Sequence, residues 1–234
     1  TVYFAKRTNR ILGANEEIQG RFDIDEKVDY ETELAVIIGK EGKGITEERA
    51  EEYVFGYSVF NDLSSRDLQT RHGQWLMGKS LDNYTIMGPV IVDRTELPMP
   101  LELDIKSYVN GELRQNSNTK YLIKKIPGLI AELSKGITLE AGDIIATGTP
   151  AGVGMGFTPP RFLKKGDKVT LTAVAKSGYK LKNWSLNMDM TTITPSEGTL
   201  TDTTVSFLMP EGTMTVGAAF ESTGSEDPDT PTSV

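Results

Sequence analysis

Two glutamates separated by one residue mark the stretch of this chain that is best suited to bind a cation. Glu31 and Glu33 lie in YETELAVIIGK at positions 30–40, where an aliphatic run that ends at Gly39 is typical of a strand. Side chains alternate between the faces of a strand, so both carboxylates point to the same side. Like charges so placed repel each other unless a cation lies between them, and oxygen ligands favour Mg²⁺, Mn²⁺ or Ca²⁺. The other interpretation is a solvated strand face that carries two glutamates.

A second polar stretch follows the next predicted strand. The apolar run at 54–60 leads into NDLSSRDLQ at 61–69, and Lys79 follows directly after Gly78. A buried strand that ends at a group of Asp, Arg, Gln and Lys residues is a common way to present a functional site. Gly78 indicates a close approach of two backbone segments. The alternative is a capped surface loop with a local Asp–Arg pair.

Composition excludes several classes of protein. The chain has 234 residues and a net charge of −8, which argues against a nucleic-acid surface because such a surface needs a basic patch. It has no cysteine, so disulfides, thiolate metal sites and cysteine nucleophiles are excluded, and its one histidine, His72, excludes a multi-histidine metal site within this chain. No apolar run approaches the roughly 18 residues of a membrane span, so we expect no membrane segment.

The elements expected to position these residues are mostly strands. They are predicted at 30–39, 54–60, 85–92, 101–109 and 144–146. Asn110-Gly111 predicts a type I′ hairpin turn. The strand at 144–146 opens into a glycine-rich loop at 147–154, which lacks the lysine and the following helix of a P-loop. We expect the backbone amides of this loop and the Thr149 hydroxyl to bind a carboxylate.

Two helices are predicted. A short one follows Thr46, a plausible N-cap, and ends near Tyr53. The other has helical apolar spacing over 119–133 but is interrupted by Pro127, so we expect it to restart at Pro127 as its first residue, N1, and to end at Gly136.

Five motifs occur in a fixed order along the chain. They are Glu31-x-Glu33-Leu-Ala-Val, Asn61-Asp62-x-Ser64-x-Arg66-Asp67-x-Gln69, Gly78-Lys79-Ser80, the Asn110-Gly111 hairpin and Thr147-Gly148-Thr149-Pro150. In this order they resemble the fumarylacetoacetate hydrolase family, over roughly residues 1–168. The resemblance implies a mixed β fold with few short helices (α+β), built on a β-roll, and an enzyme that is usually a homodimer.

The resemblance also implies the site residues. The metal ligands would be Glu31, Glu33 and Asp62, holding Mg²⁺ or Mn²⁺, with Ca²⁺ as a further possibility. The residues that line the substrate site would be Arg66, Gln69, Lys79, Gly148 and Thr149. A 2-oxo acid would chelate the metal through a carboxylate oxygen and its keto oxygen, and the metal would stabilise an enolate as a C–C bond breaks. Lys79 would hold the developing charge, Gln69 would orient water or substrate, and Thr149 would hold the carboxylate.

Family members hydrolyse acylpyruvates, fumarylpyruvate or fumarylacetoacetate-like diketo acids, decarboxylate oxaloacetate, or isomerise and hydrate 2-hydroxyhepta-2,4-dienedioate-type compounds of aromatic catabolism. Smaller members carry, upstream of the region that matches Phe4, a His–Glu pair that activates water. No such segment is present in this sequence, and we interpret His72 as a loop residue because a lone histidine needs an oriented partner to act as a base. We therefore expect the rate of hydrolysis to depend more on that pair than the rate of metal-assisted decarboxylation or enolisation does.

The end of the chain departs from the family pattern. Residues 169–221 resemble one unit of the small all-β repeats of bacterial surface proteins, with Gly-Tyr-x-Leu-x-Asn-Trp, then Phe-x-Met-Pro, then Thr-Val-x-Ala-x-Phe. The sequence thus predicts a catalytic domain at 1–168 that is truncated at its start, a β-repeat module at 169–221 and a disordered acidic tail at 222–234. The first part suggests a cytoplasmic location, whereas the repeat alone would suggest the cell surface.

Two functions from different classes follow. The first is a divalent-metal-dependent hydrolase or decarboxylase of short 2-oxo acids, with an isomerase or hydratase as its variant. The second is a non-catalytic module that keeps a metal site while the repeat carries the function. Replacing Glu33 or Asp62 separates them, since only the first has turnover to lose.

Overall fold

The computed structural model describes residues 2–13, 16–174, 179–188, 191–192 and 214–222. The chain divides into two compact units, residues 1–174 and 175–234. Within the described ranges no helix is long and apolar enough to cross a membrane.

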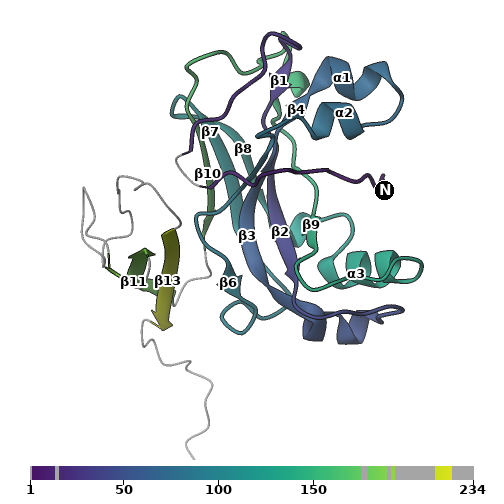
Figure 1. Cartoon of the computed structure of the whole chain (residues 1–234), viewed down its shortest axis with the longest axis vertical. Helices are drawn as coiled ribbons and strands as arrows, with labels where there is room; N and C mark the ends of the chain where they lie inside the picture. The colour runs from purple at the N-terminus through teal and green to yellow at the C-terminus, as the bar shows by residue number, and fades with distance from the viewer. Residues whose placement is uncertain (1, 14–15, 175–178, 189–190, 193–213, 223–234) are drawn as a thin grey trace, which may run out of the picture. The chain divides into compact units, whose positions relative to one another are not determined.

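A central antiparallel sheet carries the two glutamates (Figure 1). Its strands are β2 (Thr32–Ile38), β3 (Val54–Asp62), β5 (Thr85–Met87), β6 (Val92–Asp93) and β9 (Ile144–Ala146). The order is β5-β3-β2-β9, and β6 also pairs with β3. Every residue of β2 is buried, because both of its faces pack against other parts of the unit. The predicted strand at 85–92 is split in two, since Pro89 has no N–H for the ladder.

The alternation expected in β2 is confirmed. Leu34, Val36 and Ile38 pack in one apolar cluster, together with Ile130 of the helix α3 (Ile126–Ser134). Ala35 and Ile37 belong to a different cluster on the opposite face. Glu31 and Glu33 continue this second face toward the start of the strand.

A second sheet has the order β10-β7-β8, with β7 (Asp104–Val109), β8 (Glu112–Asn118) and β10 (Val169–Val174). The hairpin between β7 and β8 turns at Asn110 and Gly111, whose φ angles of 51° and 80° are those a type I′ turn requires. β10 pairs with β7 over its whole length. The first unit therefore ends after Val174, whereas the sequence placed the boundary after residue 168.

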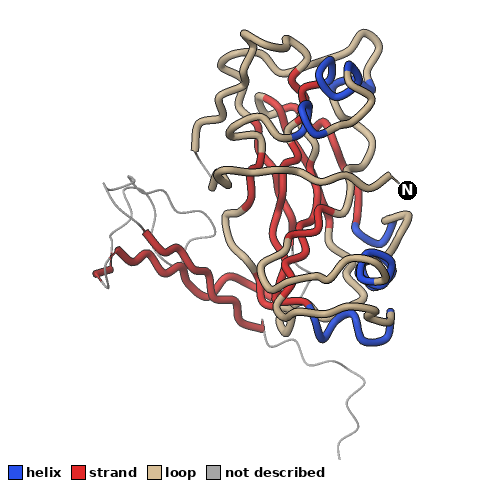
Figure 2. Tube along the Cα trace, turned by 45° about the vertical axis from the view of Figure 1, so that its right-hand side comes forward, coloured by secondary structure: helices blue, strands red, loops and turns tan. Residues whose placement is uncertain are grey.

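Short helices lie at the two ends of the sheets (Figures 1 and 2). At one end α3 and the 3₁₀ helix η1 (Glu47–Tyr53) cover the apolar core. The helix α3 begins at Ile126, so Pro127 lies in its first turn but one residue later than predicted. At the other end lie α1 (Arg66–Arg71) and α2 (Leu76–Lys79), beside the two-stranded pair β1 (Val28–Asp29) and β4 (Ser64–Ser65). Two further 3₁₀ turns are η2 (Thr119–Tyr121) and η3 (Gly154–Gly156).

In the second unit, β11 (Tyr179–Met188) pairs antiparallel with β12 (Thr191–Thr192) and β13 (Met214–Ser222). The Gly-Tyr-x-Leu-x-Asn-Trp and Thr-Val-x-Ala-x-Phe segments contribute to β11 and β13. The Phe-x-Met-Pro segment and residues 223–234 of the expected tail lie outside the described residues. The likeness to a surface-protein repeat stays a prediction.

Candidate metal centre

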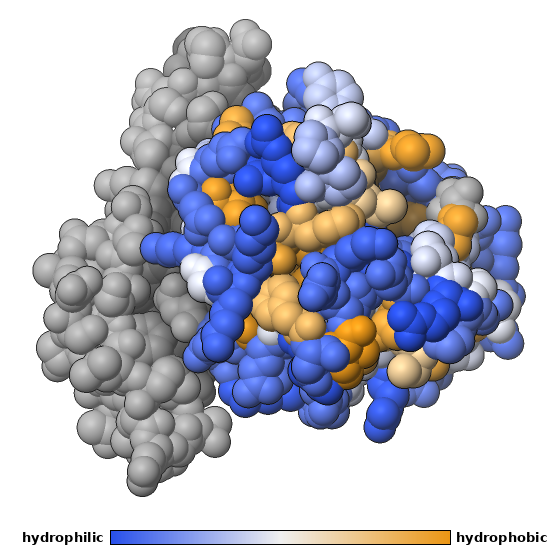
Figure 3. Space-filling view, turned by 90° about the horizontal axis from the view of Figure 1, so that it is seen from above, coloured by the Kyte–Doolittle hydropathy of each residue, from blue (hydrophilic) through white to orange (hydrophobic). Residues whose placement is uncertain are grey.

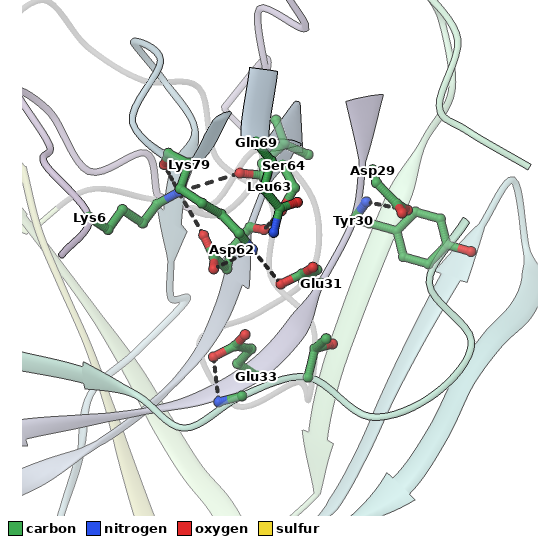
Figure 4. Close-up of polar contacts among 12 residues, drawn as sticks. Lys6, Asp29, Tyr30, Glu31, Glu33, Asp62, Leu63, Ser64, Gln69 and Lys79 are labelled. Atoms are coloured by element: carbon green, nitrogen blue, oxygen red, sulfur yellow. Dashed lines mark hydrogen bonds and ion pairs between the residues drawn. The ribbon is translucent and has the colours of Figure 1, made fainter. Parts of the chain in front are cut away.

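Three carboxylates meet where β2 and β3 lie side by side (Figure 4). One oxygen each of Glu31, Glu33 and Asp62 lies within 4.8 Å of the others, and all three residues are buried. The register explains the meeting, because Thr32 and Glu33 face Asn61 and Phe60 on the neighbouring strand. The Glu31 N–H also donates to the Asn61 side chain at 3.0 Å, and the Asp62 N–H donates to the Glu31 carbonyl at 2.9 Å.

The charge on Glu33 is poorly compensated. Its side chain accepts one hydrogen bond within the described part of the chain, from Gly148 N at 2.7 Å. Burial, followed by the charges of Asp62 and Glu31, raises the pKa of Glu33 to about 8. Three hard oxygen donors with excess negative charge are the ligand set of a divalent cation such as Mg²⁺, Mn²⁺ or Ca²⁺. The residues present therefore fit the metal that the sequence predicts.

Lys79 bridges two of the carboxylates. Its Nζ lies 2.7 Å from Glu31 Oε2 and 2.8 Å from Asp62 Oδ2, and its side chain is only 2% exposed. Gly78 makes this placement possible, because a Cβ there would lie 2.4 Å from the backbone nitrogen of Gln69. The close backbone approach predicted for Gly78 is thus confirmed, as the contact that holds α2 against α1.

Arg66 and Gln69 come from successive turns of α1 and are both buried. Arg66 Nη1 lies 2.6 Å from Glu31 Oε1 and donates to Gln69 Oε1 at 2.9 Å. The structure therefore brings these two predicted residues to the same edge of the carboxylate cluster as Lys79. His72, in contrast, is exposed at the C-cap of α1.

The loop after β9 reaches the cluster through its backbone. Gly148 has a φ of +96°, a conformation that favours glycine, and donates its N–H to Glu33. The Thr149 hydroxyl donates to the Thr32 carbonyl at 3.0 Å and accepts from Gln115 Nε2 at 2.7 Å. A hydroxyl has one proton, so Thr149 must turn from Thr32 before it can donate to a substrate carboxylate.

Sequence reasoning missed Lys6. Its Nζ lies 2.8 Å from Asp62 Oδ1 and also donates to the backbone carbonyls of Leu63 and Lys79 (Figure 4). Burial lowers the pKa of the Lys6 ammonium, and the neighbouring Asp62 carboxylate opposes that shift. The ion pair is close but not directed as a hydrogen bond, and Asp62 Oδ1 has no hydrogen-bond partner among the described residues. No local pattern in the sequence points to Lys6.

Sequence reasoning also missed two fully or nearly buried aspartates beside the cluster, Asp25 and Asp29. Asp25 accepts from Ser65 Oγ at 2.6 Å and from the backbone of Asp67 and Leu68 at the start of α1.

The outer surface at this end of the molecule is mostly hydrophilic, with smaller hydrophobic areas between the polar side chains (Figure 3). The carboxylate cluster itself lies beneath that surface.

The fold and the site together define a domain of mostly β structure with few short helices, which carries a buried carboxylate cluster that could hold a divalent cation. A family profile described as fumarylacetoacetate (FAA) hydrolase C-terminal matches residues 1–187 of this sequence. The chain therefore belongs to the fumarylacetoacetate hydrolase family.

Several relatives and solved structures resemble this chain. Oxaloacetate tautomerase YisK of Bacillus subtilis is 50% identical over 169 residues, which are 72% of this chain and 56% of that protein. An uncharacterized Staphylococcus aureus protein is 46% identical over the same shares. The chain thus spans little more than half the length of these curated relatives.

Among solved structures, the fumarylacetoacetate hydrolase of Exiguobacterium antarcticum is 47% identical, with a TM-score of 0.68 over 70% of this chain and 58% of that one. Fumarylpyruvate hydrolase of Pseudomonas aeruginosa, solved with Mn²⁺ and pyruvate, is 32% identical, with a TM-score of 0.58 over 70% and 65%. The 5-carboxymethyl-2-hydroxymuconate delta-isomerase of Mycobacterium smegmatis is 34% identical, with a TM-score of 0.58 over 72% and 59%.

Proposed function

We propose that this domain binds a divalent cation and catalyses an enolate-forming reaction on a short 2-oxo acid, with oxaloacetate as the first substrate to test. The observation that carries the proposal is the buried cluster of Glu31, Glu33 and Asp62, in which burial, followed by the charges of Asp62 and Glu31, raises the pKa of Glu33. These three residues would hold Mg²⁺ or Mn²⁺. When bound, the cation would act as a Lewis acid on the keto oxygen of the substrate.

The charge balance around the cluster suits an anionic substrate. Among the described residues, four buried carboxylates meet three cationic side chains here: Asp29, Glu31, Glu33 and Asp62 with Lys6, Arg66 and Lys79. A divalent cation would turn this small negative excess into a small positive one. A monoanion such as pyruvate would then neutralise the site, and the dianion oxaloacetate would leave it with a small negative charge.

In this proposal the side chains of the chain hold charge and orient the substrate. Lys79 and Arg66, which both touch Glu31, stabilise negative charge that develops on the enolate oxygen. Gln69 orients the substrate or a water molecule. Thr149 binds a substrate carboxylate, with its hydroxyl turning away from Thr32 to do so. Gly148 lines the substrate site, with its N–H donated to Glu33.

Decarboxylation and enolisation fit this set of residues better than hydrolysis. Loss of CO₂ from oxaloacetate leaves the enolate of pyruvate, which takes a proton from solvent to give pyruvate. Movement of a proton from C3 to the keto oxygen gives the enol tautomer of oxaloacetate. Neither reaction needs an activated water molecule, whereas C–C hydrolysis does. The Bacillus subtilis relative, whose name describes oxaloacetate tautomerisation, supports this order.

The test is turnover of oxaloacetate and acetylpyruvate by the purified chain with Mn²⁺ and then with excess chelator. We expect chelator-sensitive oxaloacetate turnover that falls at least about 10²-fold in Glu33→Gln, since a neutral ligand weakens the metal site. Glu51→Gln is the control, because Glu51 is a half-buried glutamate that accepts from Met99 N at 2.9 Å, outside the site. Equal turnover in both variants would contradict the proposal.

A second candidate is hydrolysis or isomerisation of larger diketo acids. The Pseudomonas aeruginosa hydrolase and the Mycobacterium smegmatis isomerase support it, since they resemble this chain over 70% and 72% of its length. Acetylpyruvate cleavage faster than oxaloacetate turnover would favour this candidate. Metal binding by calorimetry with no turnover of either compound would favour a non-catalytic module.

We also propose that the chain is a homodimer, as the family resemblance implies. Light scattering of the full chain measures this directly. A mass near twice 25.7 kDa is expected, and a mass of one chain would contradict the proposal.

A further inference from the structure

A buried carboxylate that the proposed chemistry does not use lies next to the metal centre. Asp29 is the last residue of β1, and its exposed fraction is 0%. Its Oδ2 accepts from Arg66 Nε at 3.0 Å, lies 2.9 Å from Arg66 Nη2 and accepts from Met155 N at 3.0 Å. Its Oδ1 accepts from Gly154 N at 2.6 Å and Tyr30 N at 3.0 Å. Asp29 therefore joins an arginine side chain to a distant backbone loop.

On one side Asp29 fixes the direction of Arg66. Two nitrogens of the guanidinium contact Asp29 Oδ2, and the third, Nη1, reaches Glu31 and Gln69 at 2.6 and 2.9 Å. A guanidinium is planar, so holding two of its nitrogens sets the position of the third. Without Asp29, Arg66 would keep its charge but lose its fixed orientation toward Glu31.

On the other side Asp29 holds the loop that begins at Gly148. A Cβ on Gly154 would lie 2.7 Å from Asp29 Oδ1 and 2.5 Å from the Arg161 carbonyl, so only glycine lets the backbone come this close. Tyr30 adds a second tie to the same loop, because its hydroxyl donates to the Gly152 carbonyl at 2.9 Å.

We propose that Asp29 is a positioning residue, which sets Arg66 and the Gly152–Met155 backbone in a fixed relation to Glu31 and Gly148. The proposal rests on the proposed function, because the groups it positions are those assigned to bind the 2-oxo acid. The polar contacts of the Asp29 side chain in the described structure go to Arg66 and to backbone amides, and none goes to Glu31, Glu33 or Asp62. Its loss should weaken substrate binding more than metal binding.

Asp25 provides a matched control. It is a buried aspartate near the same helix, and it also accepts several hydrogen bonds, from Lys27 N, Ser65 Oγ, Asp67 N and Leu68 N. It contacts neither Arg66's guanidinium nor the Gly152–Met155 loop in the described structure. Asp29→Asn and Asp25→Asn therefore remove the same charge from two similar environments, of which one is proposed to organise the site.

The first readout is hydrogen exchange by NMR, which needs no activity. In the wild type we expect slow exchange of the Arg66 Nε–H, assigned through Arg66→Lys, and of the Gly154 and Met155 amides. Asp29→Asn should speed all three at least about tenfold, since their shared acceptor loses its charge. Asp25→Asn should leave them slow. Unchanged exchange of the Arg66 Nε–H in Asp29→Asn overturns the proposal, and so does equal acceleration in both variants.

A second pair of variants approaches Asp29 from the loop, in case Asp29→Asn does not fold. Gly154→Ala presses its Cβ against Asp29 Oδ1 and should speed exchange of the Arg66 Nε–H. Gly156→Ala is the control, since the nearest atom to a Cβ there is Val153 Cγ2 at 3.9 Å. If the Arg66 Nε–H exchanges at the same rate in Gly154→Ala and Gly156→Ala, the proposal is contradicted.

Calorimetry then separates positioning from a merely structural role. We expect Asp29→Asn to weaken pyruvate binding to the Mn²⁺-loaded chain about tenfold and to change the Kd for Mn²⁺ less than about threefold. Asp29→Asn and Arg66→Lys together should lose less than the sum of their separate losses, because both variants break the same contact between Asp29 and Arg66. Additive losses would contradict the inference. If the wild type binds no pyruvate and has no turnover, the proposed function fails, while hydrogen exchange still decides whether Asp29 holds Arg66.

Discussion

Two groups of buried carboxylates lie within one end of this molecule, and they differ in how their charge is compensated. Asp25 and Asp29 are surrounded by N–H and O–H donors, several of them backbone amides. Glu33 has one such donor and two carboxylate neighbours within the described structure. The pKa values follow, since that of Glu33 is raised to about 8, whereas that of Asp25 is lowered.

Asp25 is a carboxylate whose hydrogen bonds hold segments of the fold together, whereas Glu33 is one whose surroundings suit a bound cation. Burial by itself raises the pKa of either group, so the difference comes from the partners. At Asp25 hydrogen bonds from Ser65 and three backbone amides outweigh the loss of water. At Glu33 burial and the charges of Asp62 and Glu31 outweigh the single hydrogen bond from Gly148, so the pKa is raised. A cation bound to these oxygens would offset the repulsion among the three carboxylates.

The largest effect on stability is expected when Lys79, which bridges Glu31 and Asp62, is removed. Lys79→Met leaves Glu31 and Asp62 buried without that partner, and we expect a loss of about 3–5 kcal/mol in the free energy of unfolding. Urea unfolding with chelator present measures it. Added Mn²⁺ should restore part of the loss, because it supplies positive charge to the same oxygens. A loss under about 1 kcal/mol would show that the cluster tolerates its own repulsion.

Metal addition should stabilise the wild type, and this stabilisation should depend only on the carboxylate cluster of Glu31, Glu33 and Asp62. At a free Mn²⁺ concentration of about 100 times its Kd, the expected gain in the free energy of unfolding is about 2.7 kcal/mol. Glu33→Gln should lose most of this gain, whereas Asp25→Asn should keep it. Thermal scans with and without Mn²⁺ would show the difference, and equal gains in the two variants would place the metal elsewhere.

Asp25→Ala should have a smaller effect that metal does not reverse. Asp25 accepts from the Asp67 and Leu68 amides at the start of α1, so its removal resembles the loss of a helix cap and should cost about 0.5–2 kcal/mol. The measurement is urea unfolding with Mn²⁺ and with chelator. Rescue by Mn²⁺ would assign Asp25 to the metal centre and would contradict its separation from the metal-binding carboxylates.

The smallest expected effect is in the pH dependence of stability. The folded pKa of Asp25 lies below its ordinary value of 3.8, so the folded state favours the ionised form. The stabilisation from Asp25 is therefore present above that value and is lost as the pH falls through the folded pKa. The difference in stability between wild type and Asp25→Asn should shrink as the pH is lowered from 6 toward about 3. A difference that grows with acid would reverse the sign of the shift.

Local signals predicted several parts of the fold. The alternation from Glu31 to Ile38 placed the glutamates on one face of β2, because a strand has a period of two whatever surrounds it. Asn110-Gly111 predicted its hairpin for a similar reason, since both residues readily adopt positive φ. Pro127 marked the start of α3, because its fixed φ suits a first turn.

The helices α1 and α2 were not predicted, and the reason is a contact across the chain. The residue before α1, Ser65, makes no side-chain capping hydrogen bond among the described residues. The start of the helix is instead held by Asp25, which accepts from Asp67 N at a separation of 42 residues. The first unit extends to Val174 for a related reason, since β10 belongs to it through pairing with β7.

The sequence by itself determined the family, the three carboxylates and the lysine beside them, because these residues occur in short motifs with fixed spacing. Only the tertiary structure decided how the cluster is surrounded. Lys6 reaches Asp62 from 56 positions away, and Asp29 reaches Gly154 from 125 positions away. Such contacts depend on where the folded backbone brings distant segments together. Local spacing carries no record of that geometry, because propensity and periodicity act over only a few residues.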